Sequence, residues 1–236
     1  MIGSLNYNDY LKLYKSNSIS SKNFDFNQIQ PSSLDLSLSD ECYEIKYSFL
    51  SPDSKVRRKL KKVILNKINL KDSFIFEVNK TYLVKLNEKL NLKEDIFGHC
   101  NPKSSTGRLD VFCRTVVDYS NEYEKIPKNY SGEIFLEITS RSFNIKFKSG
   151  DKLNQLRLVY KKHNYLSDLN LRKFNEKNKI IFSKDSNSNT YIDNGLKVSV
   201  NLSNSKKVIA YCAKINTPVL NFNNINSHKV TDFWIP

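Results

Sequence analysis

The amino-acid sequence predicts an all-β protein, either a sandwich or a barrel. Between residues 63 and 160, short segments rich in Val, Ile, Leu, Phe and Tyr alternate with polar turns at short intervals. That spacing favours a sandwich or barrel over alternating strands and helices. The 236 residues fit one large domain, or one domain and part of a second. With 39% apolar and 12% aromatic residues, the chain can fill a core.

The individual elements follow from local periodicity. Residues 5–15 carry apolar side chains at helical spacing and predict a short N-terminal helix. A polar loop is expected up to residue 33, and then Leu34, Leu36 and Leu38 alternate with polar residues, which predicts a strand with one buried face. Further strands are expected at VILNKINL (63–70), SFIFEVN (73–79), TYLVKLN (81–87), DVFCRTVV (110–117), EIFLEIT (133–139), FNIKFK (143–148) and NQLRLVY (154–160).

The last third of the chain differs from the rest. Residues 165–190 are polar and resemble a linker, and two more strands are expected at 196–202 (LKVSVNL) and 207–213 (KVIAYCA). No internal repeat is visible.

The charge is strongly positive, because 38 Lys and Arg residues outweigh 24 Asp and Glu residues by 14. A surface biased toward Lys explains this better than an electrostatic site for a polymer. The densest basic run, residues 55–62 (KVRRKLKK), contains no aromatic residue that could stack on bases. We therefore interpret it as a solvated helix or loop face and not as a nucleic-acid site.

Several protein classes are excluded. No run of about 18 apolar residues predicts a membrane span, and the N-terminus lacks the apolar region of a secretory signal. The four cysteines form no CxxC motif. We expect reduced thiols and a cytoplasmic location.

Glycine is scarce and unevenly placed. The chain has 6 glycines where average usage gives about 16, and four of them are Gly98, Gly107, Gly132 and Gly150. We expect positive φ or close backbone approach at these positions. The segment 101–108 (NPKSSTGR) around Gly107 offers hydroxyls, a Lys and an Arg. Such groups suit a phosphate, although a plain polar turn fits the spacing equally well. No Walker or Rossmann glycine motif is present.

Three other polar residues lie in or beside predicted strands. In 133–139, a period of two places Glu137 on the face of Glu133 and Phe135, opposite Ile134. A lone strand Glu is usually exposed, and a functional role requires a pocket. Asp118 ends an apolar run, and Gln155 follows the turn at Gly150.

Taken in order, these segments resemble the deoxycytidine triphosphate (dCTP) deaminases of the dUTPase-like superfamily. The family segment [K/R]SSxxR corresponds to 103–108, the Asp before a loop to Asp118, the SGxIxLE strand to 131–137 and the G-x-x-[IL]-x-Q-L strand to 150–156. Upstream, 30–36 (QPSSLDL) resembles the family's QPASxDL strand. The likeness covers residues 5–160.

The phrases NPKSSTGRLDVF, IPKNYSGEIFLEIT, SGDKLNQLRL and the late DFW are most similar to a long bacterial form, in which one chain joins two dUTPase-like units. By this resemblance, residues 1–165 form one dCTP deaminase/dUTPase-like domain. Residues 166–236 form an extension that leads toward a second unit and stops before completing it. The fold implied is a distorted β-barrel or β-clip with a short N-terminal helix.

The resemblance implies hydrolytic deamination of dCTP to dUTP and ammonia, with Mg²⁺ carried on the triphosphate and no zinc. The zinc deaminases need H-x-E and P-C-x-x-C motifs, and neither is present. The resemblance further implies a homo-oligomer, a trimer or pseudo-trimer, whose active sites are shared between units. No membrane or nucleic-acid polymer is expected as a partner.

Residue by residue, the resemblance gives Glu137 the role of general base that activates water against C4 of cytosine. Ser104 and Arg108 would hold the water and the tetrahedral centre. Lys103 and Ser105 would hold phosphates, Gln155 would contact phosphate, and Asp118 would lie near the deoxyribose.

Three alternatives remain open at this point. Asp118 could serve a dUTPase or a bifunctional enzyme that forms dUMP, and the same fold could bind nucleotide without turnover. A basic nucleic-acid module ranks last. Two departures from the family pattern bear on these alternatives: the segment between Asp118 and Ser131 is longer than in the short enzymes, and no segment matches the family's closing C-terminal arm.

Overall fold

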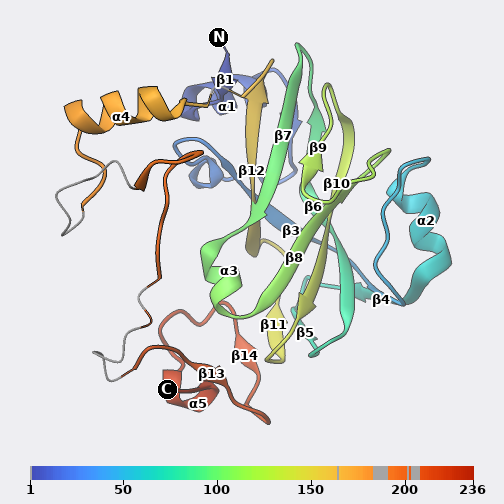
Figure 1. Cartoon of the computed structure of the whole chain (residues 1–236). Coiled ribbons are helices and arrows are strands. Elements are labelled where there is room, and N and C mark those ends of the chain that lie inside the picture. Colours follow the sequence, from blue (N-terminus) through green and yellow to red (C-terminus); the bar gives the residue numbers. More distant parts are fainter. Residues whose placement is uncertain (1, 164, 183–190, 201, 203–207) are drawn as a thin grey trace. The chain divides into compact units, whose positions relative to one another are not determined.

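The computed structural model describes residues 2–163, 165–182, 191–200, 202 and 208–236. The chain forms two compact units, one of residues 1–162 with 212–235 and one of residues 163–211 with Pro236. Each is described by itself (Figure 1).

The first unit consists mainly of strands. Its elements are β1 (Gly3–Ser4), α1 (Tyr7–Lys15), β2 (Ile19–Ser20), the 3₁₀ turn η1 (Phe26–Gln28), β3 (Leu34–Ile45), α2 (Val56–Val63), β4 (Ile64–Asn69), β5 (Phe74–Phe76), β6 (Thr81–Asn91), β7 (Ile96–Pro102), α3 (Ser104–Arg108), β8 (Val111–Val117), β9 (Lys125–Ile126), β10 (Ser131–Ser140), β11 (Ile145–Phe147), β12 (Lys152–Tyr160), β13 (Cys212–Ala213), β14 (Leu220–Asn221), α5 (Val230–Phe233) and β15 (Trp234–Ile235).

The main sheet curves into a nearly closed barrel with the strand order β8-β10-β6-β3-β12-β7-β9. Glu124 links the two ends of this order. Its backbone carbonyl accepts from the Cys100 N–H of β7 at 2.7 Å, and its backbone N–H donates to the Thr115 carbonyl of β8 at 3.1 Å. The predicted all-β barrel with a short N-terminal helix is confirmed.

Two hydrophobic clusters lie on opposite faces of the barrel wall. The larger cluster contains the alternate residues Leu34, Leu36 and Leu38 of β3 and Ile134 and Leu136 of β10. The smaller cluster lies on the other face, where α2 packs against β3, β6, β8 and β10 (Figure 1). It contains Val56, Leu60, Val63, Tyr43, Ile45, Leu83, Val116 and Phe135. The predicted alternation along β10 is therefore confirmed.

The prediction of one buried face on the strand at residues 34–38 is wrong. Asp35 and Ser37 are each 4% exposed. Both are buried because polar partners cover their side of β3: Asp35 forms an ion pair with Lys103, and the Ser37 hydroxyl donates to Glu88 at 2.7 Å.

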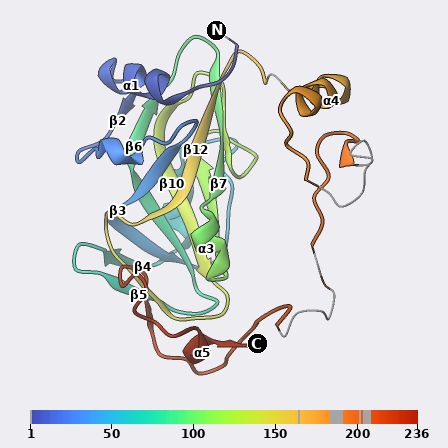
Figure 2. The same ribbon diagram turned by 90° about the vertical axis from the view of Figure 1, so that its left-hand side faces the viewer.

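Helix α1 begins with a capping box at Asn6, whose side chain accepts from the backbone N–H groups of Asn8 and Asp9. The Tyr10 hydroxyl accepts from Leu158 N–H at 2.8 Å and donates to the Leu156 carbonyl at 3.0 Å, which fixes α1 to β12. Figure 2 shows α1 at the end of the barrel where the chain begins.

The basic run 55–62 becomes α2, which is solvated on one side only. Val56, Leu60 and Val63 are buried, and Arg57 enters an ion-pair network described below. Segment 101–108, expected as a polar turn or a phosphate cradle, ends β7 and forms the short helix α3.

Three of the four glycine expectations hold. Gly150 has a φ of +90°, and a Cβ at Gly98 would meet Leu156 and Leu158 at 2.9 Å. A Cβ at Gly132 would lie 2.5 Å from the Tyr130 hydroxyl. The expectation is wrong for Gly107, where nothing lies within 4 Å of an added Cβ.

The second unit contains a helix where a linker was expected. Helix α4 (Asp168–Lys177) begins at Ser167, whose hydroxyl accepts from Asn170 N–H. The Asp168 carboxylate accepts from the N–H groups of Asn194 and Gly195, each at 2.9 Å. Residues 183–190 of the predicted linker lie outside the described residues.

The prediction of two late strands, at residues 196–202 and 207–213, is largely wrong. Residues 196–200 form no strand, while residue 201 of that prediction lies outside the described residues. Of the 207–213 prediction, residue 207 also lies outside them, and only Cys212–Ala213 is a strand. Residues 212–235 instead belong to the first unit, where β14 pairs with β11 and Phe233 contacts Phe143 edge-on.

Candidate active site

Glu137 is a buried carboxylate in the middle of β10. Its exposed fraction is 3%, so it is not the solvated strand Glu that is the commoner case. Arg114 lies directly opposite on β8. Its guanidinium donates to Oε1 of Glu137 from Nε at 3.1 Å and from Nη2 at 2.5 Å. Oε2 is buried and has no hydrogen-bond partner among the described residues. One oxygen is therefore fixed and the other is available as a proton acceptor.

Arg114 itself is held by aromatic rings. Its Cζ lies 3.9 Å from the ring centroid of Tyr123 and 5.1 Å from that of Phe112. Burial raises the pKa of Tyr123, the negative charge of Glu137 raises it further, and Arg114 opposes both effects. A guanidinium that contacts two aromatic rings loses little further conformational freedom when it binds a carboxylate.

Asp118 lies in the turn that follows β8 and is bonded to α2, the helix that covers the Glu137 face of the barrel wall. Its Oδ1 accepts from Val56 N–H at 2.7 Å, at the first turn of α2. Its own N–H donates to the Tyr130 hydroxyl at 3.3 Å. This carboxylate therefore has a structural task in addition to any contact with a deoxyribose, which stays a prediction.

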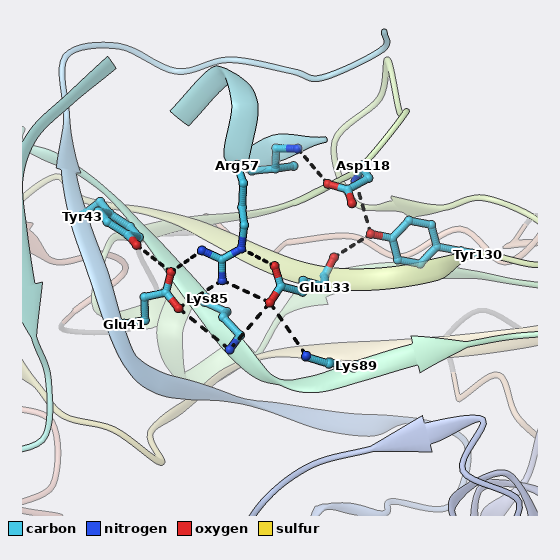
Figure 3. Close-up of polar contacts among 9 residues, drawn as sticks. Glu41, Tyr43, Arg57, Lys85, Lys89, Asp118, Tyr130 and Glu133 are labelled. Carbon is cyan, nitrogen blue, oxygen red and sulfur yellow. Dashed lines mark hydrogen bonds and ion pairs between the residues drawn. The ribbon is translucent and has the colours of Figure 1, made fainter. Parts of the chain in front are cut away.

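Next to Asp118, Arg57 joins α2 to the sheet (Figure 3). It donates to both carboxylate oxygens of Glu41 at 2.7 and 3.1 Å, and to both of Glu133 at 2.5 and 3.1 Å. Hydrogen bonds from Arg57 lower the pKa of Glu133. At Glu41, burial raises the pKa, but bonds from Arg57 and Tyr43 outweigh it and the pKa is lowered.

The phosphate-binding candidates lie on another part of the wall. Lys103, just before α3, forms an ion pair with Asp35 of β3. Gln155 of β12 is the register partner of Asp35, and its Oε1 accepts from the Ser33 hydroxyl at 3.3 Å. The structure thus brings Lys103 and Gln155 next to Asp35, and their contact with phosphate stays a prediction.

Helix α3 presents the remaining candidates to solvent. Thr106 is buried, and its hydroxyl donates to the Leu153 carbonyl at 3.0 Å, which anchors the turn. Ser104, Ser105 and Arg108 are exposed, and their side chains form no hydrogen bond or ion pair among the residues the structure describes. They are free to contact a ligand or a second chain.

The seven predicted residues therefore form two groups within one chain. Glu137 and Asp118 lie on the face covered by α2. Lys103 and α3 follow β7, and Gln155 lies on β12. No hydrogen bond or ion pair among the described residues joins the two groups.

Sequence reasoning missed Arg114, Tyr123 and Arg57. A signal existed for Arg114, a lone charge inside the apolar run VFCRTVV. Its partner could not be read from the sequence, because the β8–β10 register determines that it faces Glu137.

The four cysteines are free, and Cys212 is exposed while the others are buried.

Two features are absent from the described part of the chain. None of the helices there is long and apolar enough to cross a membrane. Within the same residues, no three His, Cys, Asp or Glu side chains gather closely enough to hold a metal ion.

Comparison with known proteins identifies the family. Residues 1–162 match the model for the 2'-deoxycytidine 5'-triphosphate deaminase (DCD) N-terminal domain, and residues 167–236 match the model for its C-terminal domain. The crystal structure of 2'-deoxycytidine 5'-triphosphate deaminase from Agrobacterium tumefaciens superposes with a TM-score of 0.91 at 33% identity. That match covers 100% of this chain and 68% of the other.

The EIAV dUTPase gives a TM-score of 0.32 at 23% identity over 42% of this chain and 78% of its own. No curated protein matches the sequence. Because the two family models together span almost all of its residues, the chain belongs to the dCTP deaminase family.

Proposed function

We propose that this protein hydrolyses the C4–N4 bond of dCTP and releases dUTP and ammonia, with Glu137 as general base. The observation that carries the proposal is the state of that side chain. Glu137 is 3% exposed, its Oε1 is held by Arg114, and its Oε2 has no partner among the described residues. A fixed, desolvated carboxylate with one open oxygen suits proton transfer to and from a reacting water.

The proposed reaction needs only proton transfers and one nucleophilic addition. Oε2 of Glu137 takes a proton from water as the water oxygen bonds to C4, and the C4=N3 π electrons move to N3, which gives a tetrahedral centre. The same carboxyl then returns the proton to N4. The C4–N4 bond breaks to release ammonia, the C4=N3 bond re-forms, and the resulting 4-hydroxyl form shifts its proton to N3 to give dUTP. Water and dCTP are consumed and no redox partner is required.

The second group supplies the remaining contacts. Arg108 and Ser104 would hold the attacking water and the tetrahedral centre by charge and hydrogen bonds. Lys103, Ser105 and Gln155 would hold the triphosphate. Asp118, which belongs to the first group with Glu137, would face the deoxyribose. Mg²⁺ would enter with the triphosphate as part of the substrate.

The two groups suggest that each active site is assembled from two chains. Among the described residues, no hydrogen bond or ion pair joins them within one chain, and α3 is exposed with its Ser and Arg side chains unengaged. We propose a homo-oligomer, a trimer or pseudo-trimer, in which α3 of one copy faces Glu137 of the next. The division of the chain into a domain at 1–165 and an extension at 166–236 also stays a prediction.

Product analysis tests the activity. The protein is incubated with dCTP and Mg²⁺, ammonia is measured, and nucleotides are separated. We expect one ammonia for each dUTP. Formation of dUMP from dCTP would show a bifunctional enzyme, and dCTP binding without ammonia release would leave only a nucleotide-binding role.

Complementation tests the shared site. Glu137→Gln and Arg108→Ala chains are each expected to be inactive. When the two are unfolded together and refolded as a mixture, sites that combine Glu137 from one chain with Arg108 from the other regain activity. A mixture that stays as inactive as its parents, although it forms mixed oligomers, would show that sites are not shared.

A further inference from the structure

Arg114 is the residue that binds the Glu137 carboxylate, and none of the sequence motifs gave it a role. It is a strand residue directly across β8–β10, and it approaches one carboxylate oxygen with two N–H groups. An Arg–carboxylate pair often forms two parallel bonds, one to each oxygen. Here both bonds converge on Oε1, and Oε2 is left without a partner among the described residues.

This one-sided geometry has a cost. A buried carboxylate oxygen without a donor is unfavourable, and such groups in native structures call for an explanation. The Arg57 network in the same sheet shows that the protein can satisfy carboxylates fully, since each oxygen of Glu41 and Glu133 receives a bond from that guanidinium. The exception at Glu137 therefore reflects a task for Oε2.

The guanidinium cannot easily turn to cover Oε2. The ring of Tyr123 lies 3.9 Å from Cζ and that of Phe112 lies 5.1 Å away, and Nη2 also donates to the Ser48 hydroxyl at 3.3 Å. The Arg114 side chain is 28% exposed and that of Glu137 is 3% exposed, so the guanidinium carries most of what this pair shows to solvent. The contacts with the two rings, the bond to the Ser48 hydroxyl and the bonds to the Glu137 carboxylate together fix one orientation of the guanidinium.

From this geometry we propose that Arg114 is a positioning residue. It holds Oε1 of Glu137, so that Oε2 is the oxygen presented to the reacting water. The proposal rests on the proposed function, in which Glu137 is the general base. Arg114 acts on the rate of the chemical step through Glu137 and does not itself bind the nucleotide.

The test compares Arg114→Lys and Arg114→Ala with the unchanged protein in steady-state dCTP deamination. Lys keeps the charge but cannot give two N–H groups to one oxygen while it stacks on Tyr123. We expect kcat to fall about 10-fold for Lys and about 100-fold for Ala, because small misplacements of a catalytic group cost that much. KM for dCTP should stay within about 3-fold, since uniform binding is not removed. Arg58→Lys and Arg58→Ala are the matched controls, because Arg58 is exposed on α2 and its side chain forms no hydrogen bond or ion pair among the described residues.

Folding and chemistry are separated in two ways. Thermal melts confirm that each variant is folded, and Arg114→Lys carries the test if Arg114→Ala is not. Added guanidinium at low millimolar concentration should raise kcat of Arg114→Ala several-fold and leave that of Arg58→Ala unchanged.

Three results would overturn the inference: a folded Arg114→Lys with unchanged kcat, a loss expressed only in KM, or an absence of guanidinium rescue in folded Arg114→Ala. Glu137→Gln, measured alongside, tests the underlying assignment. If Glu137→Gln is active, the proposed function fails; if it is inactive while Arg114→Lys matches the unchanged protein, only the role of Arg114 fails.

Discussion

Replacement of Arg57 by Met gives a quantitative test of the contacts that fix α2 over the sheet. Met keeps the unbranched side chain and helix propensity of Arg but removes four hydrogen bonds to Glu41 and Glu133 (Figure 3). It also removes the cation–π contact in which Arg57 Cζ lies 5.5 Å from the Phe135 ring.

The expected loss of stability depends on how exposed Arg57 is and on which cation stays near the two carboxylates. Arg57 is 41% exposed, so each ion pair is worth about 1 kcal/mol, the upper end for exposed pairs with good geometry. The carboxylates are not left alone: Lys85 lies 3.9 Å from Glu41 and 3.8 Å from Glu133. The penalty of about 3–5 kcal/mol for an unpaired buried charge therefore does not apply. We expect a loss of about 2 kcal/mol in the free energy of unfolding at neutral pH.

The pH dependence has a definite sign. The pKa values of Glu41 and Glu133 both lie below their usual value in the folded protein. A lowered pKa gives stabilisation that is complete above the unfolded pKa of about 4.5 and is lost as the pH falls through the folded pKa. The difference between the Arg57→Met and unchanged proteins should therefore shrink as the pH falls from about 5 to about 2.

Urea unfolding at several pH values measures this difference. Arg58→Met on the same helix is the control, because it makes the same chemical change at an exposed position. A loss that stays constant down to the lowest pH, or a loss equal to that of Arg58→Met, would refute the role given to these ion pairs.

Three further substitutions test other contacts. Gly132→Ala should destabilise the protein by about 1–3 kcal/mol in urea unfolding, because the new Cβ would lie 2.5 Å from the Tyr130 hydroxyl that Asp118 N–H binds; an unchanged midpoint would contradict the contact. Tyr10→Phe should cost about 1–3 kcal/mol by the same measurement, since it unpairs two buried backbone groups of β12, and no loss would show that they find other partners. Lys103→Met should raise KM for dCTP and destabilise the fold by unpairing Asp35; adding Asp35→Asn should restore stability but not KM, and recovery of both would remove Lys103 from the phosphate site.

The barrel was predictable from the sequence because its strands are marked locally. Alternation alone placed Ile134 and Leu136 on one face of β10 and Glu137 on the other, and the structure confirms this. Strand β7 was missed, since IFGHCNP contains a Gly and ends in a Pro, residues that are depleted in strands.

Features set by packing between distant segments were not predictable. Helix α4 has a weakly apolar face and no buried residue, so its sequence resembles a linker. Burial of Asp35 and Ser37 depends on Lys103 and Glu88, which lie far along the chain. The pairing of Arg114 with Glu137 depends on strand register, to which a single strand gives no clue.

The candidate site was predictable to the extent that its motifs resemble a family. Those motifs named Lys103, Ser104, Arg108 and Glu137, but their distribution over two parts of the barrel wall appears only in three dimensions. Asp118 shows the limit most plainly, because its bond to Val56 N–H at the start of α2 could not be foreseen from either segment.

The most direct test of the account is ammonia release by Glu137→Gln, measured together with dCTP binding by calorimetry. Gln has nearly the same shape as Glu but cannot accept the proton from water. We expect kcat to fall by about 10²–10⁴-fold, the usual contribution of a general base, while the Kd for dCTP changes little. Glu133→Gln, on the same face of β10 but paired with Arg57, should keep its kcat. Ammonia release by Glu137→Gln at the rate of the unchanged protein would contradict the assignment.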